Sequence, residues 1–189
     1  MDDELNLREI IERARNYDTE AFGRLYNLYF DKIFRFAYCK IGSRHEAEDI
    51  AEQTFLRALE KIAEFKWRGV PFSSWLFRIT SNLIVDYYRS NKYETVDIAE
   101  EAIVNHDDGC SPEQSAVQEL ERREIVKAIR SLTWEQQQVI AMRFFAGMTN
   151  EEVAKAIGKN VGAVKALQHR AVESLGRILG ASYSEARYR

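Results

Sequence analysis

The stretch SRHEAEDIAEQTFLRALEKI, residues 43–62, decides the fold of this chain. Its apolar positions recur every three or four residues: Ala47, Ile50, Ala51, Thr54, Phe55, Ala58, Leu59 and Ile62. This spacing is typical of an amphipathic helix that buries one face. Ser43 and Glu46 have the spacing of a capping box, in which each side chain satisfies a backbone N–H at the helix start. The stretch therefore predicts a helix from Ser43 to Ile62 within a helical bundle.

Two further helices are predicted around this one. Before it, apolar residues at helical spacing predict a helix over residues 22–37, and the short link Ile41-Gly42 favours an antiparallel arrangement of the two. After it, a helix is expected from about Phe72 to Arg89. Together with the N-terminal segment, these helices predict a first compact domain over residues 1–93.

The second half of the chain predicts another bundle behind an acidic linker. Residues 94–111 have no clear period, and residues 94–124 carry 10 acidic and 2 basic side chains, net −8. Residues 1–93 are neutral, and residues 125–189 have a net charge of +5. Three more capping boxes mark helix starts in this half: Ser111/Gln114, Thr133/Gln136 and Thr149/Glu152. We therefore predict an all-α fold of two small bundles, with 94–111 as flexible linker, 112–180 as second bundle and 181–189 as tail.

Composition excludes several classes of protein. The chain has 189 residues and a net charge of −3, with no apolar run as long as a membrane span and an acidic N-terminus without a signal segment. A cytoplasmic protein without membrane insertion is expected. Cys39 and Cys110 are far apart, and the three histidines are scattered, so neither a metal site nor a cofactor is predicted. No paired carboxylates, activated nucleophile or phosphate loop indicates an enzyme.

Residues 65–93 combine aromatic and basic side chains. Eight aromatics lie among five bases and one acid in this stretch. Bases of an unpaired nucleic-acid strand stack on aromatic rings, and its phosphates pair with Lys and Arg. Trp75 has helical spacing with Ile79 and Leu83 and is assigned to the core, whereas Phe72 and Phe77 are ambiguous. Trp67 stands between Lys66 and Arg68 in a Gly/Pro-containing loop, and at least one of Tyr87 and Tyr88 is expected to be exposed.

Residues 149–175 predict a helix-turn-helix. Thr149 opens a helix that Gly158 can end, and Asn160 can cap a following helix with Val164, Leu167 and Ala171 on its buried face. In DNA-binding proteins of this arrangement the second helix enters the major groove. An ordinary pair of core helices would give the same pattern, but the local positive charge favours DNA.

These motifs, in this order, resemble the sigma-70 family of bacterial RNA polymerase sigma factors, in the extracytoplasmic-function (ECF) group. The likeness runs from about Ala21 to Leu179 and includes residues 46–58, 72–79, 82–89 and 161–171. The resemblance implies region 2 and region 4 domains, which bind core polymerase, melt the -10 element and recognise the -35 element. It also implies partners: the β and β′ subunits of core RNA polymerase, promoter DNA and an anti-sigma factor.

The resemblance assigns candidate residues to three surfaces. Polymerase binding falls to Asp49, Glu52, Gln53 and Arg57. Recognition and melting of the -10 element fall to Lys66, Trp67, Arg68, Phe72, Arg78, Asn82, Asp86, Tyr88 and Arg89. Recognition of the -35 element falls to Gly162, Ala163, Lys165, Ala166, Gln168, His169 and Arg170.

Two other functions remain as alternatives to a sigma factor. A helix-turn-helix regulator that works without polymerase would bind duplex DNA as a symmetric dimer and would have no use for the Trp67 loop. An all-helical protein-interaction adaptor would show no salt-dependent DNA binding.

Overall fold

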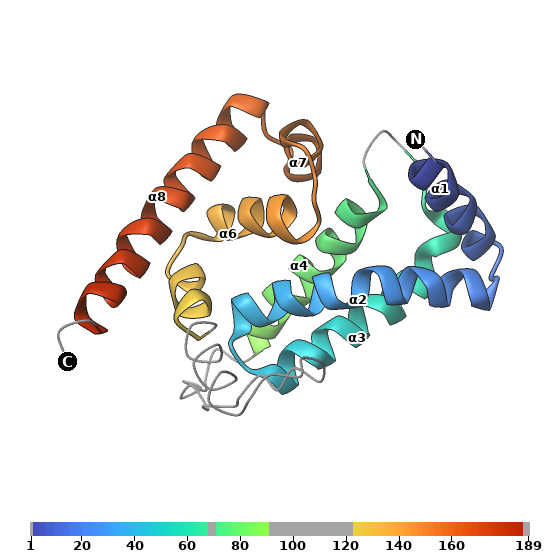
Figure 1. Ribbon diagram of the computed structural model, residues 1–189. Helices are drawn as coiled ribbons and strands as arrows, with labels where there is room; N and C mark the ends of the chain where they lie inside the picture. Colours follow the sequence, from blue (N-terminus) through green and yellow to red (C-terminus); the bar gives the residue numbers. More distant parts are fainter. Residues whose placement is uncertain (1, 68–70, 91–122, 187–189) are drawn as a thin grey trace.

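The computed structural model describes residues 2–67, 71–90 and 123–186, and within these ranges every regular element is a helix (Figure 1). The elements are α1 (Asp2–Arg15), α2 (Thr19–Ile41), α3 (Arg44–Lys61), the 3-10 turn η1 (Ile62–Glu64), α4 (Phe72–Ser90), α6 (Trp134–Ile140), the π-helical turn η2 (Ala141–Phe145), α7 (Asn150–Ile157) and α8 (Val161–Ala186). Residues 123–130 form one more helical segment. The predicted all-α class is confirmed. The predicted linker and the Ser111 capping box lie outside the described residues.

Helices α1 to α4 form the first bundle around an aromatic core. Phe36 of α2 and Phe77 of α4 are both buried, and their rings lie 5.2 Å apart. Thr54 of α3 meets Thr80 of α4 through hydroxyls 3.2 Å apart, and each hydroxyl also donates to the carbonyl four residues earlier. The buried threonines therefore satisfy their polar atoms inside the bundle, as buried hydroxyls must.

Local signals set the helix boundaries in this bundle. The Asp18 carboxylate accepts a hydrogen bond from the Ala21 N–H and caps α2. Gly42 ends the same helix at φ 83°, a left-handed conformation that glycine adopts without steric cost. The Ser43 hydroxyl then accepts from the Glu46 N–H, 3.4 Å away, and starts α3 as predicted. The turn between α2 and α3 is short because Gly42, which ends α2, is followed directly by Ser43, which caps α3.

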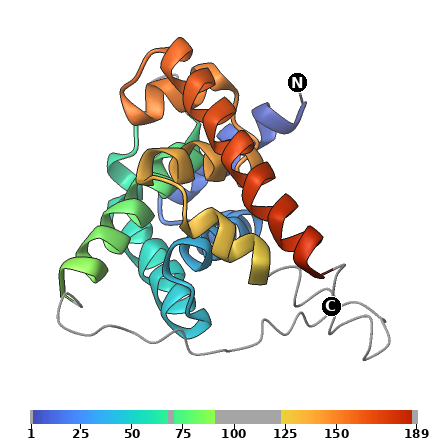
Figure 2. The ribbon, with the colours of Figure 1, turned by 90° about the vertical axis from the view of Figure 1, so that its left-hand side faces the viewer.

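The second bundle consists of the segment over residues 123–130, α6, η2, α7 and α8. The long helix α8 crosses α6 (Figure 2), and Ala171 of α8 packs with Leu132 and Ile140. The capping boxes at Thr133 and Thr149 are complete, with both the hydroxyl and the side chain three residues later engaged. These two predictions are confirmed.

The two bundles pack against each other through one continuous core, which includes Val139, Met148 and Val153 of the second bundle. The Lys40 ammonium of α2 lies 3.2 Å from the ring centroid of Trp134 at the start of α6. The Gln138 amide donates to the Ser81 hydroxyl over 3.2 Å, and the Ser74 hydroxyl lies 3.6 Å from the Met148 sulfur. One face of α4 is therefore covered by the second bundle.

Three features differ from the sequence prediction. The N-terminal segment, which was given no element of its own, forms the helix α1. Leu59 was placed on the buried face of α3 but is 39% exposed, because it lies at the edge of that face. Helix α8 continues to Ala186, past the expected end near Leu179.

Candidate nucleic-acid interface

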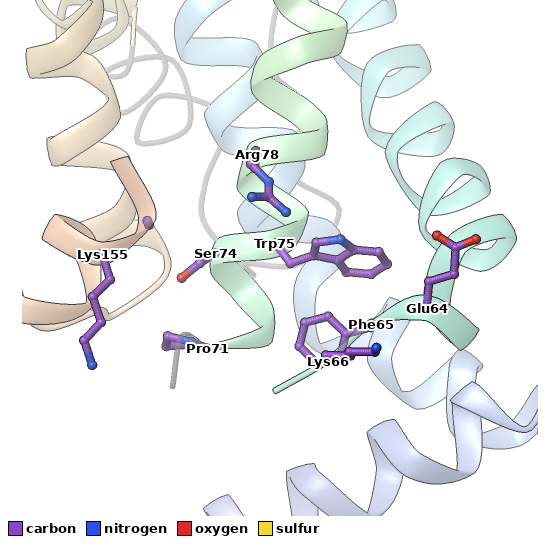
Figure 3. A pocket seen from close by; sticks show the side chains of 9 residues that line it. Glu64, Phe65, Lys66, Pro71, Ser74, Trp75, Arg78 and Lys155 are labelled. Carbon is purple, nitrogen blue, oxygen red and sulfur yellow. The ribbon is translucent and has the colours of Figure 1, made fainter. Parts of the chain in front are cut away.

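A cavity of about 590 Å³ lies where the segment after η1 meets the start of α4, with α7 on its far side (Figure 3). Trp75 and Arg78 reach it from α4, Phe65 and Lys66 from the segment after η1, and Lys155 from α7. The remaining lining residues are Glu64, Pro71, Ser74 and Ala156. Aromatic rings with three cations and one acid in one hollow match the needs of a stacked base and its phosphate.

The aromatic wall is held by ring contacts between segments distant in sequence. The Phe65 ring lies 5.2 Å from Trp75 and 5.3 Å from Phe72, and Tyr29 supports Phe72 from α2 at 5.7 Å. Phe72 was predicted as a DNA contact, but its side chain is only 1% exposed. This burial favours a supporting role, because Phe72 lies behind Phe65 and Trp75 and contacts both rings.

Trp75 has two roles where the sequence predicted one. Its ring packs against the core, as expected, and it also lines the cavity. Periodicity placed it on a buried face correctly, but could not show that the face opens to a cavity. The ring is therefore an additional candidate for base stacking.

Trp67 stands beside the cavity and is half-buried. Its ring meets Phe65 edge to face at 6.3 Å, and the Arg8 guanidinium carbon of α1 lies 4.9 Å from its centroid. Lys66 is exposed next to it. Arg68, predicted for the same loop, lies outside the described residues.

An exposed polar stripe follows the cavity along α4. Arg78, Asn82, Asp86 and Arg89 are separated by three or four residues, so they share one helix face, and all four are exposed. The Asp86 carboxylate lies 3.9 Å from Arg89. This stripe unites four of the residues predicted for the -10 element.

Tyr88 lies beside this stripe with its hydroxyl turned toward the protein. It is 43% exposed, which agrees with the expectation for one tyrosine of this pair. The hydroxyl donates to the Lys40 carbonyl over 2.5 Å. Partial burial raises the pKa of Tyr88, and nearby Arg130 opposes the shift. Only the ring of Tyr88 is therefore offered to a ligand.

The helix-turn-helix has the predicted local geometry. Gly158 ends α7 at φ 67°, and the Asn160 side chain accepts from the Ala163 N–H over 2.8 Å at the start of α8. Val164, Leu167 and Ala171 are buried. Gly162, Lys165, Ala166, His169 and Arg170 are exposed, while Ala163 and Gln168 are half-buried. The structure thus brings all seven predicted residues to the first three turns of α8.

The outer face of α3 is the third candidate surface. Glu52, Gln53 and Arg57 are exposed there and Asp49 is half-exposed. Leu56, which the prediction did not include, is 61% exposed among them. The sequence alone could have indicated this residue, because Leu56 is a leucine on the otherwise polar face of the helix.

Two further features are absent from the described residues. None of these helices is long and apolar enough to cross a membrane. In the same part of the chain, no three or more His, Cys, Asp or Glu side chains gather as metal ligands would.

The fold and these surfaces define a helical DNA-binding protein of the helix-turn-helix class. Comparison with known families then gives two matches: the Sigma-70 region 2 model fits residues 25–93, and the Sigma-70, region 4 model fits residues 122–175. The chain belongs to the sigma-70 family of RNA polymerase sigma factors, in the ECF group.

Individual relatives support the group. The ECF RNA polymerase sigma factor BldN of Streptomyces coelicolor is 37% identical over 177 residues, which cover 94% of this chain and 67% of BldN. The ECF RNA polymerase sigma factor SigW of Bacillus subtilis is 31% identical over 184 residues, 93% of this chain and 98% of SigW. The solved structure of CnrH in complex with the cytosolic domain of CnrY matches with a TM-score of 0.69 and 25% identity, over 92% of this chain and 97% of CnrH.

Proposed function

We propose that this sigma factor divides promoter recognition between the cavity with its α4 stripe and the exposed face of α8. The cavity takes an unpaired base of the -10 element, and Arg78, Asn82 and Arg89 follow the strand along α4. The face around Lys165 and Arg170 reads the -35 element in duplex form. The observation that carries this division is the part of the cavity lining that the first bundle supplies, Trp75 with Lys66 and Arg78, because an unpaired base needs a ring and a phosphate partner together.

The outer face of α3 is proposed as the contact with core polymerase. Exposed Leu56 surrounded by Glu52, Gln53 and Arg57 has the character of a protein interface, an apolar centre with a polar rim. A surface of this kind differs from the two DNA candidates, which lack an exposed leucine at their centre. The polymerase, and with it the chain, is expected in the cytoplasm.

Promoter binding requires the two bundles to separate. In the family the two promoter elements lie about 23 base pairs apart, which is about 80 Å at roughly 3.4 Å per pair. A compact chain of this length has a gyration radius of only about 16 Å. The described arrangement, with Lys155 of α7 at the cavity, is therefore proposed as the state before promoter binding.

An inhibitory protein partner, an anti-sigma factor, is proposed as well. CnrH, whose fold this chain shares, was solved in complex with the cytosolic domain of CnrY. A cavity of about 270 Å³ between α2 and η2, bordered by the exposed apolar side chains of Leu28 and Phe144, offers a place for such a partner. Competition between a captured partner and core polymerase for this chain would test the idea, and simultaneous binding of both would contradict it.

Run-off transcription tests the proposed function. The purified chain is added to core polymerase on fragments of a genomic library, and the transcripts are sequenced. Transcripts from a defined set of start sites, absent with core polymerase alone, are expected. The chain without polymerase should bind the same fragments poorly, because its first bundle is neutral overall. Tight, specific duplex binding by the isolated chain would instead favour a polymerase-independent regulator.

A further inference from the structure

Helix α1 brings a cation to the cavity region from a part of the chain to which no DNA role has been assigned. The Arg15 guanidinium donates to the Ala63 carbonyl in η1 over 3.4 Å, and Ile11 is buried in the core. Arg8 lies two turns before Arg15 and therefore on the same helix face. This face of α1 is fixed against η1 and carries the exposed Arg8 to the Trp67 ring, 4.9 Å away.

The position of Arg8 completes a row of rings with cations along it. Trp67, Phe65 and Trp75 follow one another with centroid separations of 6.3 and 5.2 Å. Arg78 lies at the Trp75 end, Lys66 in the middle and Arg8 at the Trp67 end. Phe65 is only 7% exposed, so Trp67 and Trp75 are the rings of this row that can stack on a base, and the cations along the row can pair with phosphates.

Arginine suits this place for a physical reason. A guanidinium that stacks on an aromatic ring uses its flat face, while its N–H donors lie in the plane and match the geometry of a phosphate. A charge-assisted bond from Arg to phosphate is stronger than the contact of an exposed cation with a ring. Arg8 can therefore turn from the ring to a phosphate while α1 stays docked.

We propose that Arg8 is a further DNA contact, which binds the phosphate next to the base that enters the cavity. The proposal rests on the proposed -10 role of the cavity. It extends the -10 surface from η1 and α4 to the N-terminal helix.

The test uses the full chain bound to core polymerase. Its DNA is a promoter fragment recovered by run-off transcription and prepared with a mismatched bubble at the -10 element. Dissociation constants are measured over a series of salt concentrations for the parent, Arg8→Ala, Arg8→Lys and Arg24→Ala. Arg24 is an exposed arginine of α2 outside the ring row and serves as the charge-matched control. Arg8→Ala should bind about 5-fold more weakly at low salt and lower the salt slope by about 0.7, as expected for one contact to a single strand.

The other variants make the test decisive. Arg8→Lys should keep the parental salt slope because the charge remains, and Arg24→Ala should match the parent. An unchanged slope in Arg8→Ala would overturn the proposal, even if affinity fell, because Arg8 would then only support Trp67. A parent chain that directs no run-off transcription would contradict the proposed function itself. A fully active parent with Arg8→Ala identical to Arg24→Ala would overturn only the role of Arg8.

Discussion

The cavity beside α4 and the exposed face of α8 are two candidate DNA contacts that this chain builds in opposite ways. The cavity depends on rings from α2, the segment after η1 and α4, which meet only in the folded bundle. The α8 face depends on signals within about 20 residues: a capping box at Thr149, a left-handed glycine at 158 and a cap at Asn160. One site is therefore made by tertiary packing and the other mainly by local sequence, so mutations should harm them differently.

The largest effect is expected from Phe72→Ala, which removes the support behind the cavity. Phe72 is 1% exposed and contacts the rings of Tyr29, Phe65 and Trp75. Truncation of a buried Phe costs about 3–5 kcal/mol, a large part of the roughly 5–15 kcal/mol that stabilises a domain. Urea unfolding followed by circular dichroism measures the loss.

Phe72→Leu keeps most of the buried volume and serves as the milder variant. It should fold, lose about 1 kcal/mol or somewhat more, and retain DNA binding at the α8 face. If Phe72→Ala were as stable as the parent but failed to bind a bubble template, Phe72 would be a direct DNA contact after all.

Trp67→Ala should impair melting at the -10 element and leave duplex binding by the α8 face unchanged. Loss of one stacked base costs about 1–3 kcal/mol, or roughly 5- to 150-fold in open complexes. A fluorescent base analogue in the -10 element reports melting, and a pull-down reports polymerase binding, which should not change. The matched variant is Arg170→Ala on α8, which should weaken duplex binding at the -35 element and leave melting of a pre-opened template intact. Equal melting by Trp67→Ala and the parent would remove Trp67 from the mechanism.

The contrast between the locally determined α8 face and the cavity formed by tertiary packing explains what could be predicted from the sequence. The helix-turn-helix was predicted with its caps and exposed residues because each signal lies within a few positions of the feature it determines. The helices of the first bundle were likewise visible in the apolar repeat. The supporting position of Phe72 and the second role of Trp75 were missed, because a ring on a helix gives no sign of which neighbours cover it.

Contacts between elements far apart in the sequence were beyond local prediction for the same reason. The helix α1 has an apolar repeat of Leu7, Ile10, Ile11 and Ala14, which the prediction overlooked. Its contact with Trp67 joins residues 8 and 67 and could not be seen locally. Trp134 of the second bundle lies over the ammonium of the buried Lys40, a contact that joins residues 40 and 134. Composition showed two bundles and their charges, but not that they share a core.

A smaller effect is expected from Thr149→Ala, which tests the local character of the α8 site. The Thr149 hydroxyl accepts from the Glu152 N–H over 3.2 Å, and the Glu152 carboxylate accepts from the Thr149 N–H over 2.7 Å. Loss of such a cap costs about 1 kcal/mol. Amide hydrogen exchange should rise in α7 and stay unchanged in α4 on the other side of the cavity, and Thr149→Ser should behave like the parent. Increased exchange in both regions would mean that the cavity depends on the second bundle more than its ring contacts indicate.

The last effect depends on pH and is expected at Lys40, where the two bundles meet. Lys40 is 4% exposed, and burial lowers the pKa of its ammonium to about 7. In the unfolded chain the pKa is about 10.4, so between these values the unfolded state holds a proton that the folded state has lost. Folding should therefore be penalised most below pH 7, and the penalty should shrink as the pH rises toward 10. The Trp134 ring stabilises the cation at 3.2 Å and reduces the penalty without removing it.

Lys40→Met keeps the apolar stem, removes the charge and should stabilise the chain most at low pH, as replacement of buried charges by apolar residues often does. Each pH unit between the folded and unfolded pKa is worth about 1.4 kcal/mol, so the advantage of the variant should shrink by about 2–3 kcal/mol between pH 6.5 and 9. Urea unfolding of the parent and the variant between pH 6.5 and 9 should show the two free energies of unfolding converging, because the parent gains stability as Lys40 loses its proton. Tyr88 lies close by and is unchanged in the variant, so its titration cancels in the difference. A difference that stays constant over this pH range would mean that Lys40 keeps its proton against Trp134. The meeting point of the two bundles would then be a cation–π contact that is insensitive to pH.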